Sequence, residues 1–128
     1  MNWTWIEREA VLCIHEEQLL EHGGGHGIRD ATLLDSALSR PQQLANYGLP
    51  DAFDLAAAYA FGIARNHPFI DGNKRTAWVV ARVFLILHGW DRSSTDEQSY
   101  LSMIQLASGE IEQDAFAGWL RMNSRSIL

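Results

Sequence analysis

The chain has 128 residues, of which 47% are hydrophobic and 20% charged, and its formal net charge is −6. This length predicts one domain over residues 1–128, large enough to bury a core without disulfides or a structural metal. The acidic balance argues against a broad nucleic-acid-binding surface, so we expect no direct binding of nucleic acid.

The cysteine content and the apolar stretches bear on cellular location. Cys13 is the only cysteine, so no disulfide forms within the chain, which favours a reducing compartment. Its apolar surroundings predict a small buried side chain. The first residues do not combine a basic start with an apolar run, as signal peptides do. The longest apolar stretch, 78–87, is too short to span a membrane, so a cytoplasmic protein is expected.

Apolar residues at helical spacing predict a first helix over residues about 4–21. Its expected inner face consists of Ile6, Ala10, Cys13 (or Ile14) and Leu20. Four glycines within 22–27 then predict a loop. Asp30 is expected to cap a short second helix over about 31–39, which Pro41 should stop.

Asp51 is expected to cap a third helix, where Asp54 favours the positive end of the helix dipole. Residues 55–64 are apolar nearly all round, so this helix should be buried at the centre of the fold. Pro68 ends it and keeps His67 out of helical dihedral angles.

Three further helices are predicted in the second half of the chain. The fourth runs from about Asn73 to His88 and stops at Gly89, with a core stripe of Ala77, Val80, Ala81, Phe84 and Leu87. Ser94 to Glu97 has the capping-box pattern that opens a fifth helix, which ends near Gly109. The sixth covers 111–122 and should turn inward Ile111, Ala115, Phe116, Trp119 and Leu120. Since no strand is predicted, the fold class is an all-α, six-helix bundle.

The loop between the two central helices contains polar groups of different chemistry. His67 can accept a proton near neutral pH, and Asp71 is an oxygen ligand suited to a Mg²⁺ ion that also contacts phosphate. Gly72 lets the backbone approach a ligand closely, and Asn73 can cap the fourth helix.

The first turn of the fourth helix predicts an anion site beside these groups. Backbone amides at Lys74, Arg75 and Thr76 lack helical partners there, and two of these residues are cations. A base, a metal ligand and an anion site are the parts needed for phosphoryl or nucleotidyl transfer. Each residue also has an ordinary role as a solvated loop residue or helix start, so spacing alone leaves the function open.

The same residues resemble the signature of the Fic/Doc family, His-x-Phe-x-Asp/Glu-Gly-Asn-x-Arg. The matching positions are His67, Phe69, Asp71, Gly72, Asn73 and Arg75. Outside the signature, residues 27–30, 33–42 and 107–110 look like the Doc ("death on curing") subgroup, the toxins of type II toxin–antitoxin systems. The resemblance covers essentially the whole chain and implies the same six-helix fold, with the active loop between two central helices.

Two positions depart from the wider Fic pattern. Adenylylating Fic enzymes usually carry glycine after the asparagine and a second arginine three residues after the first, where this chain has Lys74 and Trp78. Residues 73–77 instead have the Doc form. Doc proteins bind ATP in the reversed orientation and transfer its γ-phosphate to a threonine of elongation factor Tu, which arrests translation. The resemblance therefore implies a toxic protein kinase that uses ATP and Mg²⁺.

The resemblance also implies roles for individual residues. His67 would be the general base and Asp71 the Mg²⁺ ligand, while Gly72, Asn73, Lys74 and Arg75 would bind and orient the phosphates. Phe69 would be structural. Arg65 either adds a cation or is a solvated helix-end charge. Arg82, seven residues after Arg75, either replaces the missing arginine or forms a surface ion pair.

Regulation is expected to come from a separate partner. No glutamate is followed by Gly or Asn, so the chain lacks the Ser/Thr-x-x-x-Glu-Gly/Asn motif by which some Fic proteins inhibit themselves. The resemblance implies an antitoxin similar to the Phd partners of Doc, with a C-terminal segment in a groove. The exposed parts of Trp3, Trp5, Tyr47 and Trp90 are candidates to line that groove.

Three alternatives remain open. The first is a Fic-type transferase that moves AMP or another nucleotide group to a protein hydroxyl. The second is a catalytically inactive module that only binds an antitoxin. The third is a zinc site formed by His15, His22 and His26, whose spacing fits no zinc signature and is more typical of solvated histidines.

Overall fold

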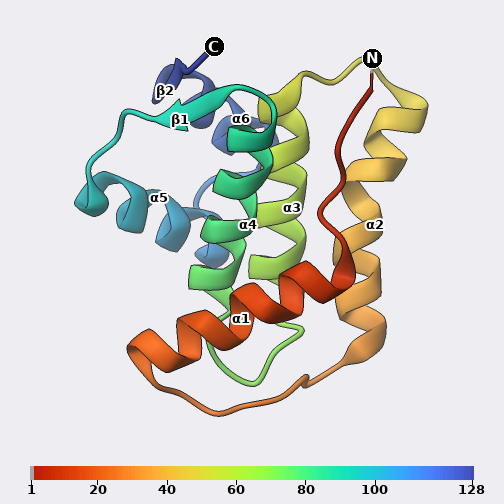
Figure 1. Ribbon diagram of the computed structural model, residues 1–128, viewed down its shortest axis with the longest axis vertical. Helices are drawn as coiled ribbons and strands as arrows, with labels where there is room; N and C mark the ends of the chain where they lie inside the picture. Colours follow the sequence, from red (N-terminus) through yellow and green to blue (C-terminus); the bar gives the residue numbers. More distant parts are fainter. Residues whose placement is uncertain (1) are drawn as a thin grey trace.

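The computed structural model describes residues 2–128, and within that range it contains six helices and one short sheet (Figure 1). The helices are α1 (Arg8–His22), α2 (Ala31–Tyr47), α3 (Ala52–Asn66), α4 (Asn73–Leu87), α5 (Asp96–Ser108) and α6 (Gln113–Met122). The strands are β1 (Trp90–Arg92) and β2 (Ser124–Ser126), which pair antiparallel. The six predicted helices are confirmed. The expectation of no strand was wrong, because three-residue strands are too short to show an alternating pattern.

Helix α3 lies at the centre of the molecule and packs against α2, α4, α5 and α6 (Figure 1). Eleven of its fifteen residues are buried, as its apolar sequence predicts. Its contact with α2 is very close at Gly62, where an added Cβ would lie 2.9 Å from the Cα of Ala37. A larger residue there would force the two helices apart, so this glycine is required by packing.

Helix α1 begins later than predicted and turns a different face to the core. Residues 2–7 precede it, and the N–H of Ile6 donates to the Tyr59 hydroxyl at 2.9 Å. Ile6 therefore lies in the segment before the helix, and its burial does not show which face of α1 is turned to the core. The buried helical residues are Val11, His15 and Leu19. Ala10, Cys13 and Leu20, which were expected inside, are exposed, and Ile14 is half-buried.

Helix α2 continues past Pro41 to Tyr47, so the predicted stop was wrong. Proline removes one helical hydrogen bond, but Pro41 is buried, and Leu44 and Ala45 beyond it pack against the core. This packing stabilises the second half of the helix. The predicted cap at the other end is confirmed, because the Asp30 carboxylate accepts from the N–H of Leu33 at 3.0 Å.

The remaining helices differ from the predictions by small shifts. In α4 the stripe is confirmed except for Leu87, which is exposed while Leu85 is buried. The capping box of α5 starts at Thr95, which pairs with Gln98, rather than at Ser94. Helix α6 buries Phe116, Ala117 and Leu120, with Ala115 exposed and Ile111 and Trp119 half-buried.

Candidate active site

The loop between α3 and α4 is held in place by the segment that precedes α2. Phe69 is fully buried and forms an isolated antiparallel bridge with Ile28. The N–H groups of Arg29 and Asp30 both donate to the carbonyl of Pro68, at 2.7 and 3.1 Å. The loop, residues 67–72, is therefore part of the packed structure although it has no regular secondary structure.

His67 adopts a left-handed backbone conformation, with φ of 50° and ψ of 55°. It is the non-glycine residue with positive φ among residues 2–128, and such a conformation is strained by about 1 kcal/mol or more. The Arg29 guanidinium holds it there by donating to the carbonyl of His67 at 2.7 Å and of Asn66 at 2.8 Å. The imidazole is thereby exposed at the end of α3.

Asn73 has a different role from the predicted helix cap. The cap position is Gly72, with φ of 80°, and α4 has no side-chain cap. Asn73 is buried, and its side chain accepts from the N–H of Phe69 and donates to the carbonyl of Phe69, both at 3.0 Å. The same amide nitrogen lies 3.3 Å from Nδ1 of His67. Because that amide nitrogen only donates, Nδ1 is the acceptor in this contact.

Asp71 is held by two partners from the N-terminal part of the chain. Its carboxylate accepts from the N–H of Gly25 at 2.6 Å, and its carbonyl accepts from Nε2 of His15 at 2.8 Å. The buried His15 ring also stacks on Phe69, with 3.8 Å between ring centroids. His15 therefore supports the loop from α1. It was considered above only as a zinc ligand. Its spacing of four residues from Val11 and from Leu19 could have placed it on the core face of α1, although not against Asp71.

The other two histidines of the zinc alternative lie beside carboxylates. His26 is 3.3 Å from Glu16, and His22 is 3.5 Å from Glu21. Within residues 2–128, no three His, Cys, Asp or Glu side chains are grouped so that they could hold a metal ion. The zinc alternative therefore has no structural support.

A pocket of about 440 Å³ lies at the start of α4. Gly72, Asn73, Lys74, Arg75 and Trp78 line it on the α4 side. Arg92, Asp96, Ser99 and Tyr100 line it from β1 and α5. The prediction that the Thr76 amide lacks a helical partner was wrong, because this N–H donates to the carbonyl of Gly72 at 3.0 Å. The amides of Lys74 and Arg75 precede this first helical bond. His67 and Asp71 are not lining residues, although Asn73 connects His67 to the pocket.

Sequence comparisons agree with this arrangement. The model of the Fic/DOC family matches residues 5–85. The chain belongs to the Fic/DOC family. It is 32% identical over 117 residues to "Protein kinase doc" of Escherichia phage P1, an alignment that covers 91% of this chain and 92% of that protein.

A second relative is "Toxin Doc" of Mycolicibacterium smegmatis (strain ATCC 700084 / mc(2)155). The two are 43% identical over 88 residues, which is 66% of this chain and 65% of that protein. The match thus spans slightly less than two thirds of the mycobacterial toxin. The family expected from the signature is confirmed. Among residues 2–128, no helix has both the length and the apolar character needed to cross a bilayer.

The two further cations considered for this Fic/DOC chain are both engaged elsewhere. Arg65 donates to the carbonyl of Leu106 at 2.6 Å and lies over the ring of Phe61, so it ties α3 to the end of α5. Arg82 pairs with Asp91 at 3.4 Å and is not a lining residue of the pocket. The N–H of Arg92, followed by the Arg82 guanidinium, holds the pKa of Asp91 below its usual value.

The aromatic residues expected to line a partner groove lie in three different environments. Trp3 and Trp5 both pack on Phe84 with centroids 6.1 Å apart, and both also line a hollow next to Gly48, Leu49 and Pro50. Tyr47 is almost fully exposed. Trp90 packs on Phe53 at 5.0 Å and is not a lining residue of that hollow.

Proposed function

We propose that this protein is the toxin of a toxin–antitoxin pair and transfers the γ-phosphate of ATP to a threonine of elongation factor Tu, which stops translation. The observation that carries the proposal is the pocket at the uncapped start of α4, where Lys74 and Arg75 stand next to the loop that carries His67. The relative named as a protein kinase, aligned over nearly its whole length, supports phosphate transfer over other chemistries of the same loop.

The start of α4 supplies the phosphate site in this proposal. A helix N-terminus attracts anions through its unpaired N–H groups and its dipole. Here Gly72 occupies the cap position, so no side-chain oxygen competes with a phosphate for those N–H groups. Lys74 adds a point charge, and Arg75 can bind two phosphate oxygens at once.

His67 acts as the general base on the target hydroxyl. It accepts the hydroxyl proton while the oxygen bonds to the γ-phosphorus, and the bond from that phosphorus to the β-phosphate oxygen breaks to release ADP. Because Nδ1 accepts from Asn73, the proton of a neutral ring is on Nε2. Nδ1 is then the atom that takes the proton, after the 3.3 Å contact opens. That contact is long and therefore weak.

Asp71 fits a Mg²⁺ ion that is shared with nucleotide phosphates. Its Oδ2 accepts from Gly25, and Oδ1 has no hydrogen-bond partner among residues 2–128. One carboxylate is enough where substrate phosphates and water complete the coordination. Bound there, the ion would neutralise phosphate charge. The protein's own contribution is to fix the carboxylate through Gly25 and the backbone through His15.

ATP labelled at either the α or the γ position tests the reaction. Incubation with elongation factor Tu should label the factor only from γ-labelled ATP, and the His67→Ala variant should give no label. Label from the α position would show nucleotidyl transfer instead. Absence of label from both positions, with folded protein, would favour a module that only binds an antitoxin.

A separate, Phd-like antitoxin completes the proposal, since the relatives include a protein named as a toxin. The protein would act in the cytoplasm, where its target is. Expression of the chain alone in a bacterial host should arrest growth, and His67→Ala should relieve the arrest. Normal growth with the unchanged chain, at a verified protein level, would contradict toxicity.

A further inference from the structure

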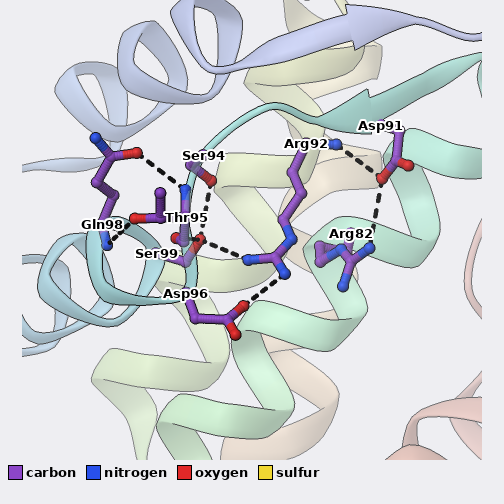
Figure 2. A network of polar contacts seen from close by, with 8 residues as sticks. All are labelled: Arg82, Asp91, Arg92, Ser94, Thr95, Asp96, Gln98 and Ser99. Carbon is purple, nitrogen blue, oxygen red and sulfur yellow. Dashed lines mark hydrogen bonds and ion pairs between the residues drawn. The ribbon is translucent and has the colours of Figure 1, made fainter.

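The pocket has a third cation, Arg92, that does not belong to the signature loop or to α4. Arg92 is the last residue of β1 and lies between α4 and α5 in sequence. Its Nη2 donates to the Asp96 carboxylate at 2.5 Å, and its Nη1 donates to the Ser99 hydroxyl at 3.3 Å (Figure 2). The guanidinium therefore has a defined place in the pocket wall.

Neighbouring residues of α5 fix the position of the Arg92 guanidinium. Ser99 donates its hydroxyl proton to the carbonyl of Thr95 at 2.8 Å, so its oxygen is oriented as an acceptor for Arg92. Thr95 and Gln98 form the capping box that sets the first turn of α5 (Figure 2). This network positions the guanidinium before any ligand arrives, which reduces the entropy lost on binding.

The ion pair with Asp96 is one that a phosphate can replace. The Arg92 side chain is 28% exposed, whereas that of Asp96 is 90% exposed. A carboxylate so accessible to water forms a weak ion pair, so little free energy is lost when a phosphate displaces it from Arg92. Arg92 has five N–H donors, and Asp96 and Ser99 use two of them among residues 2–128. The pocket lining thus carries Lys74, Arg75 and Arg92 against the single carboxylate of Asp96, in a chain of net charge −6.

We propose that Arg92 is a nucleotide-binding residue that grips the ATP phosphates from the α5 side of the pocket, with Asp96 holding the guanidinium in place until ATP binds. The inference rests on the proposed use of ATP. It gives Arg92 the role considered above for Arg82, whose guanidinium is paired with Asp91 outside the pocket lining (Figure 2). The phosphates are then bound between the α4 side and the α5 side of the pocket rather than by the α4 N-terminus alone.

Affinities for ATP, ADP and AMP test the role of Arg92. Binding is measured by calorimetry in a His67→Ala background, which prevents turnover. The proposal assigns Arg92 to the outer phosphates, so Arg92→Ala should weaken ATP binding about tenfold, ADP binding less, and AMP binding by no more than about twofold. The matched control Arg82→Ala should change none of the three. An equal loss for all three nucleotides, or no loss for ATP, would overturn the proposal.

A double-mutant cycle with Asp96 separates a phosphate contact from a purely structural ion pair. Asp96→Asn keeps an oxygen acceptor for Arg92 but removes the negative charge that competes with phosphate, so it should tighten ATP binding about threefold, and this gain should disappear when Arg92 is alanine. If Asp96→Asn gives the same gain without Arg92, only general charge is involved and the proposal fails. Should Arg92→Ala not fold, Arg92→Gln takes its place in the cycle.

The outcomes are distinct from those that test the proposed function. If label is transferred from the γ position but Arg92→Ala binds ATP normally, the kinase assignment stands and the role of Arg92 is wrong. If label comes from the α position, the kinase assignment is wrong, and the nucleotide series still decides whether Arg92 contacts phosphate.

Discussion

The two central helices, α3 and α4, have the same length but begin in opposite ways. Helix α3 starts with a complete capping box, in which the side chains of Asp51 and Asp54 each accept from the other's backbone N–H. Arg121 of α6 binds both carboxylates, at 2.9 and 3.2 Å. Helix α4 starts at Gly72 with no side-chain cap. The N-terminus of α3 is completed by the protein's own side chains, whereas that of α4 has no side-chain cap and fits the proposed phosphate site.

The two helix N-termini also differ in the charges of their first turns. Acidic residues at a helix N-terminus stabilise it, and Asp51 and Asp54 do so for α3. The first turn of α4 instead carries Lys74 and Arg75, which the helix dipole disfavours by a few tenths of a kcal/mol each. His15, Gly25, Arg29 and the side chain of Asn73 hold the loop there from other parts of the structure. The cations at the start of α4 therefore do not serve helix stability, and they are consistent with the proposed phosphate site.

The largest expected effect comes from removing the proposed base, His67, in the loop that leads from α3 to α4. His67→Ala should lower the rate of phosphate transfer by about 100-fold to 10,000-fold, because a positioned general base contributes that much. Stability should change little, since the imidazole is exposed. Transfer rates and urea unfolding measured on the same preparations separate the two effects. A rate within a few-fold of the unchanged protein would remove His67 from the reaction.

The next largest effect concerns the support of the loop from α1. His15→Ala removes the hydrogen bond to the Asp71 carbonyl and the stack on Phe69. We expect a loss of about 2 kcal/mol in the free energy of unfolding, with a lower transfer rate because the loop is no longer fixed. The control is His22→Ala, an exposed residue of the same helix, which should leave both quantities unchanged. If His15→Ala behaves like this control, the loop does not depend on α1.

The difference between the two helix starts also explains what the sequence could predict. The cap of α3 depends on Asp51 and Asp54, three residues apart, and was predicted from local spacing. The signature loop was found for the same reason, since its groups are consecutive. The roles of His15 and Arg29 could not be found this way, because their contacts join residues 56 and 38 positions apart in the sequence. The proposed role of Arg92 depends on a pocket that β1 and α5 form together with α4.

Errors in the predicted helices have a related origin. The end of α2 and the start of α1 were mispredicted at Pro41 and Ile6, because both residues are placed by tertiary packing that a single sequence does not show. Of the two roles considered for Arg82, the surface ion pair is confirmed by its contact with Asp91, whereas Arg92 was not considered at all. Helical spacing places Arg82 on one face of α4, but it does not show that β1 brings Asp91 to that arginine and Arg92 to the pocket.

A smaller effect is expected from removing the cap of α3. Asp51→Ala should lower the free energy of unfolding by about 1 kcal/mol, as loss of an N-cap does, and should leave the transfer rate unchanged. Asp51→Asn is the milder variant, because asparagine also caps helices well. Chemical unfolding and the transfer assay measure the two quantities. A clear fall in transfer rate without loss of stability would mean that the α3 end also serves function.

The smallest effect is the pH dependence of the same cap. Burial of Asp51 raises its pKa, but the Asp54 N–H and the Arg121 guanidinium lower it by more, so the net pKa lies below 3.8. A carboxylate with a lowered pKa in the folded state contributes stability above its unfolded pKa and loses it as the pH falls through the folded pKa. The stability advantage of the unchanged protein over Asp51→Asn should therefore be constant near neutral pH and shrink below about pH 4. An advantage that persists unchanged through this range would mean that Asp51 acts through hydrogen bonding alone and that its charge does not matter at the α3 end.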